Sequence, residues 1–342
     1  METVPHKTSR PGRRATIREI AEFAGVSIAT VSRVVNGSGY VSEKTRTAVE
    51  SVIREHRYTA NRSARGLSAG RTGLVGVTLP RIHPAYFSVI TAGVAEALYE
   101  LDMRIVLAPT LHEHDREVGL LERLMHGTTD GGLLVLPEES GSELRTLMTY
   151  GYRFVVVDPR VRIDDRVPTV SAAHSSGADQ ATRYLLGLGH RRIAAITGAG
   201  DMMATEERLR GYRAALAAAG VAPDPAIVIE SNWEVGGGRE AGAALLELAD
   251  PPTAIFAFND PLAIGAMQAV LARGLRVPDD DTAECELVTP ALTTVRQPLA
   301  EMGRMGVSLL MRLLENRSFE ALHVELATAL IVRASTAPAP IR

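Results

Sequence analysis

The hydrophobic pattern of residues 15–67 predicts three short helices followed by a basic hinge. Thr16 can cap the first helix, and Glu19, three residues later, completes a capping box. Apolar residues then recur at helical spacing, at Ile17, Ile20, Ala21 and Ala24. Ser42 caps a third helix, predicted from residue 43 to about residue 56, which covers the open side of this small core.

The first two helices are joined by a tight turn. Gly25 ends the first helix, and Ser27 caps the next one almost at once, which predicts a helix-turn-helix. The second helix is predicted from Ile28 to Val35. Its core-facing residues are Val31, Val34 and Val35. Its other face carries small or polar groups suited to base edges and phosphates, namely Ser27, Ile28, Ala29, Thr30, Ser32 and Arg33.

From Gly73 onward, short apolar strands alternate with helical segments. The predicted strands are 74–79, 104–110, 131–137, 154–158, 192–198, 226–231, 254–260 and 292–295. The predicted helices are 88–101, 113–126, 177–188, 206–219, 237–249 and 263–274. This alternation is typical of parallel sheets with helices on both faces. Because the units are too many for one sheet of ordinary width, we predict two doubly wound subdomains, or lobes, that meet near 172–176 and again near Pro298.

The charge of the chain is divided unevenly. Residues 1–71 hold 13 Lys and Arg against 6 Asp and Glu, whereas the whole chain of 342 residues has a net charge of −3. The remainder therefore carries about −10. A basic end on an acidic body is typical of a nucleic-acid-binding module joined to a partner domain.

Several protein classes are disfavoured by the sequence. No apolar run reaches the roughly eighteen residues of a membrane helix, so no membrane partner is expected. Residues 1–14 are basic but precede no apolar segment, which argues for a disordered arm rather than a signal peptide. Cys285 is the only cysteine, so a disulfide within the chain is impossible. We therefore expect a cytoplasmic protein.

The motifs of both parts carry a family resemblance. The stretches GVSIATVSRVVNGSGYVSEKTR and NRSARGL resemble the DNA-binding headpiece of the LacI (lactose/galactose repressor) family of bacterial transcription regulators. The body resembles the family's effector domain in the stretches GLGHRRIAAITG, ERLRGYRAALAAAG, AIFAFNDPLAIGAMQAV and TPALTTVRQP. The resemblance implies an all-α helix-turn-helix headpiece and an α/β, periplasmic-binding-protein-like core of two doubly wound parallel-sheet subdomains.

The resemblance also implies how the chain is organised and what it does. The expected parts are an arm (1–14), a headpiece (15–60), a hinge (61–72) and an effector-binding and dimerisation domain (73–342), with lobe 1 at about 73–172 and 299–318 and lobe 2 at about 173–298 and 319–336. The expected function is that of a repressor that binds a pseudo-palindromic operator in double-stranded DNA. A sugar or sugar derivative would control it. The family assembles through its core as homodimers, and the sequence leaves a tetramer open.

Within the headpiece we expect two groups of DNA contacts. Ile28, Ala29 and Arg33 are predicted to read bases in the major groove. Thr30, Ser32 and Asn36 are predicted mainly to position the helix on phosphates. Thr16 and Ser27 are further predicted DNA contacts. By resemblance, the hinge forms a short helix in the minor groove, with contacts from Asn61, Arg62, Ala64 and Leu67. Leu67 resembles the family's wedge residue, and Ala60 stands where the family usually has proline.

The effector contacts expected by resemblance are Tyr86, Phe87, Asp158, Arg208, Trp233 and Asn259. Each leaves an alternative open. Arg208 could instead pair with an adjacent glutamate, Trp233 could pack in the core, and the sequence does not decide whether Tyr86 or Phe87 faces the ligand. Asn259 is expected to contact the ligand, while the neighbouring Asp260 is expected mainly to cap the following helix.

One segment departs from the family. After Val277-Pro278 the family continues with an apolar strand ending in Gly-aromatic-Asp-Asp, whereas this chain reads DDDTAECELVTP, about seven residues shorter. A ligand-contacting Asp is lost with the strand, unless Asp281 represents it. Either residues 282–288 replace the strand or lobe 2 is compromised, and the sequence leaves both open.

Competing functions find less support. A free sugar-binding receptor does not need the headpiece, and an α/β enzyme such as a dehydrogenase or sugar kinase would need nucleotide or catalytic motifs that the chain lacks. The stretch GGGREA lacks an acidic partner for dinucleotide binding, and His112-x-His114 lacks a third metal ligand at a sensible spacing. We therefore expect no enzyme activity, no cofactor and no metal.

Overall fold

The computed structural model describes residues 15–58, 71–83, 85–125, 127–277, 290–316 and 322–340. The chain divides into two compact units, Met1–Thr72 and Gly73–Arg342. The predicted arm, the hinge contacts at Asn61, Arg62, Ala64 and Leu67, and the shortened segment at 278–289 lie outside the described residues.

The first unit contains the three predicted helices, α1 (Ile17–Ala24), α2 (Ile28–Asn36) and α3 (Glu43–Glu55). The capping box is present, since the Thr16 hydroxyl accepts the Glu19 N–H and the Glu19 carboxylate accepts the Thr16 N–H at 2.7 Å. Gly25 ends α1 in the left-handed conformation, with φ 64°. The three helices enclose a core of Ile20, Ala21, Val31, Val34 and Val49, against which the half-buried Val35 packs.

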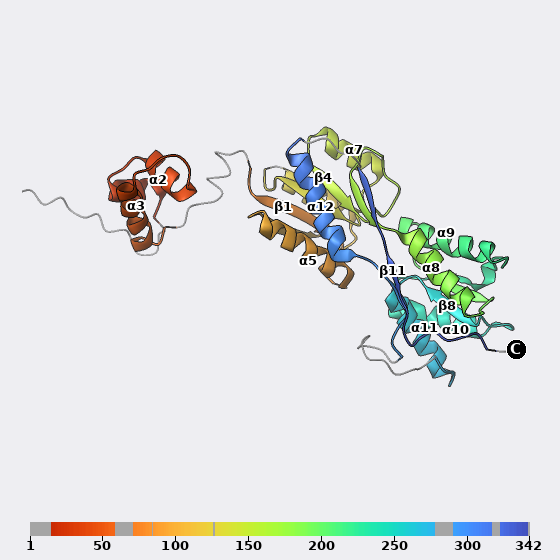
Figure 1. Cartoon of the computed structure of the whole chain (residues 1–342). Coiled ribbons are helices and arrows are strands. Elements are labelled where there is room, and N and C mark those ends of the chain that lie inside the picture. The colour runs from red at the N-terminus through yellow and green to blue at the C-terminus, as the bar shows by residue number, and fades with distance from the viewer. Residues whose placement is uncertain are drawn as a thin grey trace, which may run out of the picture. The chain divides into compact units, whose positions relative to one another are not determined.

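Lobe 1 is built on a six-stranded parallel sheet with the order β10-β5-β4-β3-β1-β2. Its strands are β1 (Leu74–Leu79), β2 (Arg104–Pro109), β3 (Gly131–Val135), β4 (Phe154–Val157), β5 (Thr169–Ala172) and β10 (His323–Leu326). Its helices are α5 (Ala85–Glu100), α6 (His114–Met125), α7 (Gly141–Thr149) and α12 (Leu299–Leu314). Figure 1 shows α5 and α12 side by side on this lobe. They approach so closely that a Cβ at Gly93 would lie 2.0 Å from the carbonyl oxygen of Ala300.

Lobe 2 has a three-stranded parallel sheet among the described residues, in the order β7-β6-β8. Its strands are β6 (Ile193–Thr197), β7 (Val228–Glu230) and β8 (Ala254–Ala257), and a 3₁₀ turn, Pro225–Ile227, precedes β7. Its helices are α8 (His174–Gly187), α9 (Met203–Ala218), α10 (Val235–Leu246) and α11 (Asp260–Ala272). β6 is wholly buried, whereas all of β8 is half-buried.

The C-terminal connections differ from the sequence prediction in two places. The strand expected at 292–295 is β9 (Thr294–Arg296), which pairs antiparallel with β11 (Ala329–Ile331) and belongs to neither parallel sheet. β10 pairs with β5 of lobe 1, so the assignment of all of 319–336 to lobe 2 was wrong for this strand. The spacing of short strands does not show which sheet edge they complete, because pairing partners lie far away in the sequence. Strand β5 and helix α7 were also not predicted.

Helix length and polarity also bear on membrane insertion. Within the described ranges, no helix combines the length and the apolar character that crossing a membrane requires.

Candidate functional site

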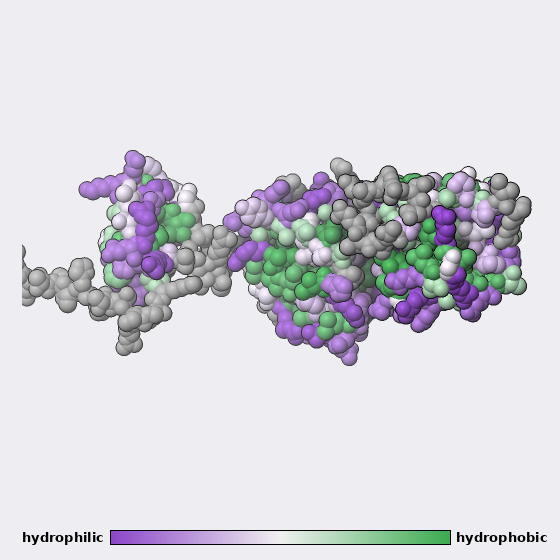
Figure 2. All heavy atoms as spheres, turned by 90° about the horizontal axis from the view of Figure 1, so that it is seen from below, coloured by the Kyte–Doolittle hydropathy of each residue, from purple (hydrophilic) through white to green (hydrophobic). Residues whose placement is uncertain are grey.

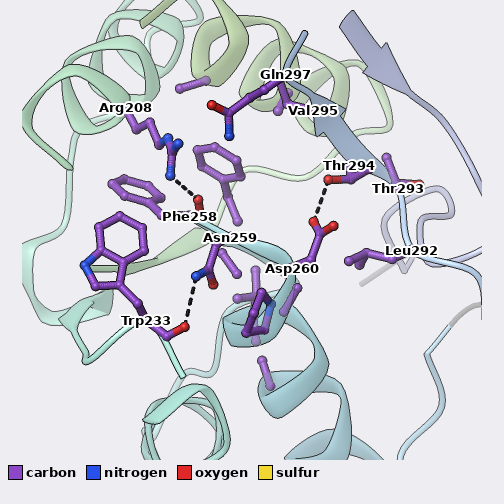
Figure 3. Close-up of a pocket in the computed structure, with 18 of the residues that line it drawn as sticks. Arg208, Trp233, Phe258, Asn259, Asp260, Leu292, Thr293, Thr294, Val295 and Gln297 are labelled. Carbon is purple, nitrogen blue, oxygen red and sulfur yellow. Dashed lines mark hydrogen bonds between the residues drawn. The ribbon is translucent and has the colours of Figure 1, made fainter. Parts of the chain in front are cut away.

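A cavity of about 1550 Å³ opens between the two lobes and continues into lobe 2, where residues of α8, β8 and α11 line it. All six residues predicted to contact an effector line it: Tyr86, Phe87, Asp158, Arg208, Trp233 and Asn259. Figure 3 shows the lobe 2 side of this cavity. The fold therefore brings these residues together from both lobes around one space.

A buried polar network crosses from lobe 1 to lobe 2 at this cavity. The Tyr86 hydroxyl, on α5, donates a short hydrogen bond to Asp158, which follows β4. The other Asp158 oxygen lies 2.8 Å from Nε2 of His174, the first residue of α8. The Arg208 guanidinium, on α9, lies 3.2 Å from Nδ1 of His174. Because a guanidinium can only donate, Nδ1 accepts, and His174 carries its proton on Nε2 toward Asp158.

The network holds Asp158 ionised although the residue is buried. Burial by itself raises the pKa of Asp158, but the interactions with His174, Tyr86 and Arg208 outweigh it and hold this pKa below its usual value. Burial raises the pKa of the Tyr86 hydroxyl, and the charge of Asp158 raises it further. Burial lowers the pKa of Arg208. A carboxylate and a guanidinium therefore face the same cavity on either side of the His174 imidazole.

Arg208 is not occupied by the adjacent acidic residues on its own helix. Glu206 pairs with Arg162 at 2.9 Å, and Glu207 pairs with Arg210. The Arg208 guanidinium instead donates to the carbonyl oxygen of Phe258 at the end of β8, as Figure 3 shows, and lies 5.6 Å from the centre of the Trp233 ring. The salt-bridge alternative is therefore wrong for Arg208.

Trp233 is held in a strained conformation beside the cavity. Its φ is 66°, in the left-handed region that a bulky residue rarely adopts. Its ring occupies the space in which a Cβ of Gly198 would lie. Its indole N–H is buried and has no hydrogen-bond partner among the described residues. The Trp233 ring also packs against both hydrophobic clusters of lobe 2, so it fills core space beside the cavity, and contact with a ligand remains a prediction.

The structure assigns the capping role to Asn259 rather than Asp260. Asn259 is the N-cap of α11 and accepts the Leu262 N–H at 2.8 Å, while its amide nitrogen donates to the carbonyl oxygen of Trp233 at 2.9 Å. Asp260 accepts a hydrogen bond from the Thr294 hydroxyl at 2.7 Å (Figure 3). Asn259 thus holds the strained Trp233 loop in place, and direct ligand contact by Asn259 remains a prediction.

Sequence reasoning missed two polar residues of this site. His174 is buried, and only its contacts with Asp158 and Arg208 show that it connects the lobes. Gln297, directly after β9, lines the cavity, and its side-chain oxygen is buried with no partner in the described part of the chain. Between the two candidate aromatic residues, Tyr86 joins the polar network, whereas Phe87 packs in the core of lobe 1.

A second set of polar contacts joins the lobes at the cavity wall. Arg160, in the loop after β4, forms an ion pair with Glu138 of lobe 1 and another, at 2.5 Å, with Asp201 of lobe 2. The carbonyl oxygen of Arg160 also accepts the N–H of Met203, the first residue of α9, at 2.7 Å. We call the Glu138–Arg160–Asp201 chain the clasp. Both Glu138 and Arg160 line the cavity.

Replacing His174 by leucine is expected to destabilise the protein. Asp158 would keep only Tyr86 as a hydrogen-bond partner, and breaking a buried pair in this way costs roughly 3 kcal/mol of unfolding free energy. Urea denaturation checks this value. In an Asp158→Asn background the same replacement should cost much less, because no buried charge is left behind. An equal cost in both backgrounds would show that His174 acts only through packing.

The candidate nucleic-acid surface is the exposed side of α2. Ser27 caps this helix by accepting the Thr30 N–H at 3.1 Å. Ile28 is 44% exposed, and Ser27, Ala29 and Arg33 are exposed as well. Thr30 and Ser32 are half-buried beside this surface, and Thr16 is exposed at the start of α1.

The two motifs rejected above as metal and dinucleotide sites, His112-x-His114 and GGGREA, have structural roles. His112 pairs with Glu138, and His114 pairs with Glu143 at 2.9 Å. No group of three or more potential metal ligands occurs in the described part of the chain. Within GGGREA, Gly238 allows α10 to touch α11, because a Cβ there would lie 2.3 Å from the carbonyl oxygen of Leu262.

Comparison with known proteins matches both parts of the chain. Residues 16–61 match the family described as bacterial regulatory proteins, lacI family, and residues 182–336 match the periplasmic binding protein-like domain. The HTH-type transcriptional regulator DegA of Bacillus subtilis is 33% identical over 334 residues, which cover 95% of this chain and 99% of DegA. The relatives are transcription regulators rather than enzymes.

Solved structures with a similar fold cover almost the whole chain. The complex of the transcriptional regulator CelR with cellobiose aligns with a TM-score of 0.71 and 34% identity, over 94% of this chain and 100% of that one. The Lac repressor dimer bound to operator and the anti-inducer ONPF aligns with a TM-score of 0.85 and 26% identity, over 95% of this chain and 100% of that one.

Proposed function

The chain belongs to the LacI family of bacterial transcription regulators, and we propose that it is a dimeric cytoplasmic repressor that binds a pseudo-palindromic operator and responds to a carbohydrate in the interlobe cavity. The single observation that carries the effector assignment is that cavity. A guanidinium, a carboxylate and a strained indole from both lobes converge on it. A ligand that touches both lobes changes the free energy of their relative position.

The surroundings of the cavity support a carbohydrate as the effector. Sugars present hydroxyls at their edges and an apolar ring face. Arg208 and Gln297 supply donors and an acceptor, and the Trp233 indole supplies a flat apolar surface. The similar regulator CelR was solved with cellobiose.

A dimer through lobe 1 is supported by its exposed apolar side chains. Tyr99, on α5, and Leu101, directly after it, are exposed, and so is Leu107 on β2, at the edge of the sheet. Figure 2 shows hydrophobic residues gathered on one side of this lobe. An exposed apolar group of this kind marks an association surface. The Lac repressor, whose fold this chain shares, was solved as a dimer on its operator.

Selection from a randomised DNA library tests the proposal. The protein should enrich a palindromic site, because two headpieces related by a dimer axis meet two half-sites. Its affinity for that site should fall by ~10³-fold or more between 50 and 200 mM salt, as expected when several phosphates are neutralised. An electrophoretic mobility shift measures both effects. A selection that enriches no palindromic site would refute the operator assignment.

A further inference from the structure

Behind the clasp, lobe 1 contains two buried glutamates that the proposed function does not use. Glu117, on α6, is 1% exposed, and Glu139, in the loop between β3 and α7, is 2% exposed. The Glu117 carboxyl accepts the backbone N–H of Glu138 at 2.9 Å. Both carboxyl oxygens of Glu139 are buried and have no hydrogen-bond partner among the described residues. An unpaired buried carboxyl is stable in a protein interior only when it is neutral.

The basic side chains around this pair contact other acidic residues. His114 lies 2.9 Å from Glu143, which also accepts the capping hydrogen bonds of Ser140. His112 lies 3.1 Å from Glu138, and Arg160 pairs with the other oxygen of Glu138. Both Leu111 and His112 have a left-handed φ, so the loop that carries His112 toward Glu138 is strained. No ion pair reaches Glu117 or Glu139 in the described structure.

These surroundings shift the titration of the pair into the neutral range. Burial, supported by the charge of Glu138, raises the pKa of Glu117 to about 7. Burial, supported by the charges of Glu117, Glu143 and Glu138, raises the pKa of Glu139 to about 8. The backbone N–H of Glu138 is the largest influence that lowers the pKa of Glu117, and Thr78, on β1, and His114 act in the same direction. Near pH 7 the pair therefore keeps a proton that an exposed pair of glutamates would have lost.

The pair is connected to the effector cavity through one residue. Glu138 donates its backbone N–H to Glu117, precedes Glu139 in the chain, and holds Arg160 of the clasp with its carboxylate. Arg160 in turn holds Asp201 of lobe 2. Negative charge that develops on Glu117 faces the backbone N–H of Glu138, and negative charge on Glu139 lies on the next residue of the chain. A displacement of Glu138 by charge repulsion would therefore reach lobe 2.

We propose that Glu117 and Glu139 form a proton-operated switch that controls how firmly the clasp holds the two lobes together. With the pair protonated, Glu138 is the only charged carboxylate of the three, and the clasp is closed. Proton loss places two further charges in a dry site, displaces Glu138 and loosens its hold on Arg160. The effector cavity opens more readily as the pH rises through the neutral range. This inference rests on the proposed function only in taking the cavity as the effector-binding site.

The direction of the stability change follows from proton linkage. Both pKa values are raised in the folded protein, so between pH 4.5 and about 8 the folded state binds more protons than the unfolded state. Stability therefore falls as the pH rises through this window. Glutamine at position 139 cannot ionise, and Glu139→Gln removes the larger part of the fall.

Thermal unfolding from pH 6 to 8.5 tests the buried pair. The melting temperature of the unmodified protein should fall by roughly 5 °C more than that of Glu139→Gln over this range. Glu117→Gln should show a smaller effect in the same direction. Glu240→Gln, at an exposed position on α10, is the matched control and should follow the unmodified protein. Parallel curves for all four proteins would overturn the assignment of the proton to this pair.

Tryptophan fluorescence tests the connection to the cavity without effector or DNA. Trp233 is the only tryptophan and lines the cavity from lobe 2. Its quenching by acrylamide should increase from pH 6 to 8.5 in the unmodified protein, and the increase should be absent in Glu139→Gln. If closing the clasp changes the pKa of Glu139 by one unit, then loss of that proton changes the ratio of closed to open clasp by about tenfold.

Asp201→Asn, which weakens the clasp itself, should show the high quenching at both pH values. If the melting temperature responds to Glu139→Gln but the quenching of Trp233 does not, the link from the pair to the clasp is refuted. Because neither measurement uses DNA or a sugar, failure of the switch is distinguishable from failure of the proposed regulator function.

Discussion

Replacing Arg208 by methionine is expected to abolish the response to the effector while operator binding persists. Methionine keeps an apolar stem of similar length but removes the guanidinium donors, which are buried between His174 and the carbonyl oxygen of Phe258. Hydrogen bonds to a charged group contribute ~1.5–3 kcal/mol each. The loss of one of them weakens effector binding by about 10- to 150-fold, and the loss of two by more.

Operator release measures this loss. Fluorescence anisotropy of labelled operator is followed while a panel of mono- and disaccharides, beginning with cellobiose, is added to the unmodified protein. The responding sugar is then tested on the variant. Arg210→Ala is the matched control, because Arg210 lies on the same helix, pairs with Glu207 and is about half exposed. An undiminished response in the Arg208 variant would refute the effector assignment, whatever the behaviour of the control.

Exchanging Ile28 and Ala29 for other residues is expected to change the preferred operator bases without abolishing DNA binding. Both residues are exposed at the start of α2, which the Ser27 cap fixes in place. Apolar side chains at these positions can discriminate bases through contacts such as that with the thymine methyl group, and a dimer applies the difference at both half-sites.

Library selection with the double variant checks this expectation. The enriched palindrome should differ from that of the unmodified protein at symmetric positions, and affinity for the new site should approach the original affinity. Glu22→Gln, at an exposed position on α1, should leave the preferred bases unchanged. If the double variant enriches the original palindrome, α2 does not read the bases at these positions.

These variants act on different parts of the chain. The Arg208 variant changes the interlobe cavity, and the α2 variants change the headpiece. All predicted DNA contacts lie in the unit Met1–Thr72, and all predicted effector contacts lie in the unit Gly73–Arg342. A protein that binds its operator but ignores sugars, and a protein that binds a new operator but still responds, would together show that recognition and regulation are separable.

The sequence by itself determined the local structure of this protein and its family. The helix starts at Thr16, Ser27 and Ser42 are visible because a cap and its partner lie within three residues. The alternation of apolar strands with helices predicted two parallel-sheet lobes, because the hydrophobic periodicity of each strand or helix is visible within its own residues. Six residues predicted to contact an effector do line one cavity.

Only the tertiary structure decided which polar groups act together. His174 lies 34 residues from Arg208, and Arg160 lies 41 residues from Asp201, so no local pattern marks these pairs. The capping role of Asn259 and the strain at Trp233 depend on one another across a loop. The placement of β10 in lobe 1 depends on the free edge of β5. Such contacts depend on how the two lobes pack against each other. The spacing of residues along the sequence does not specify that packing.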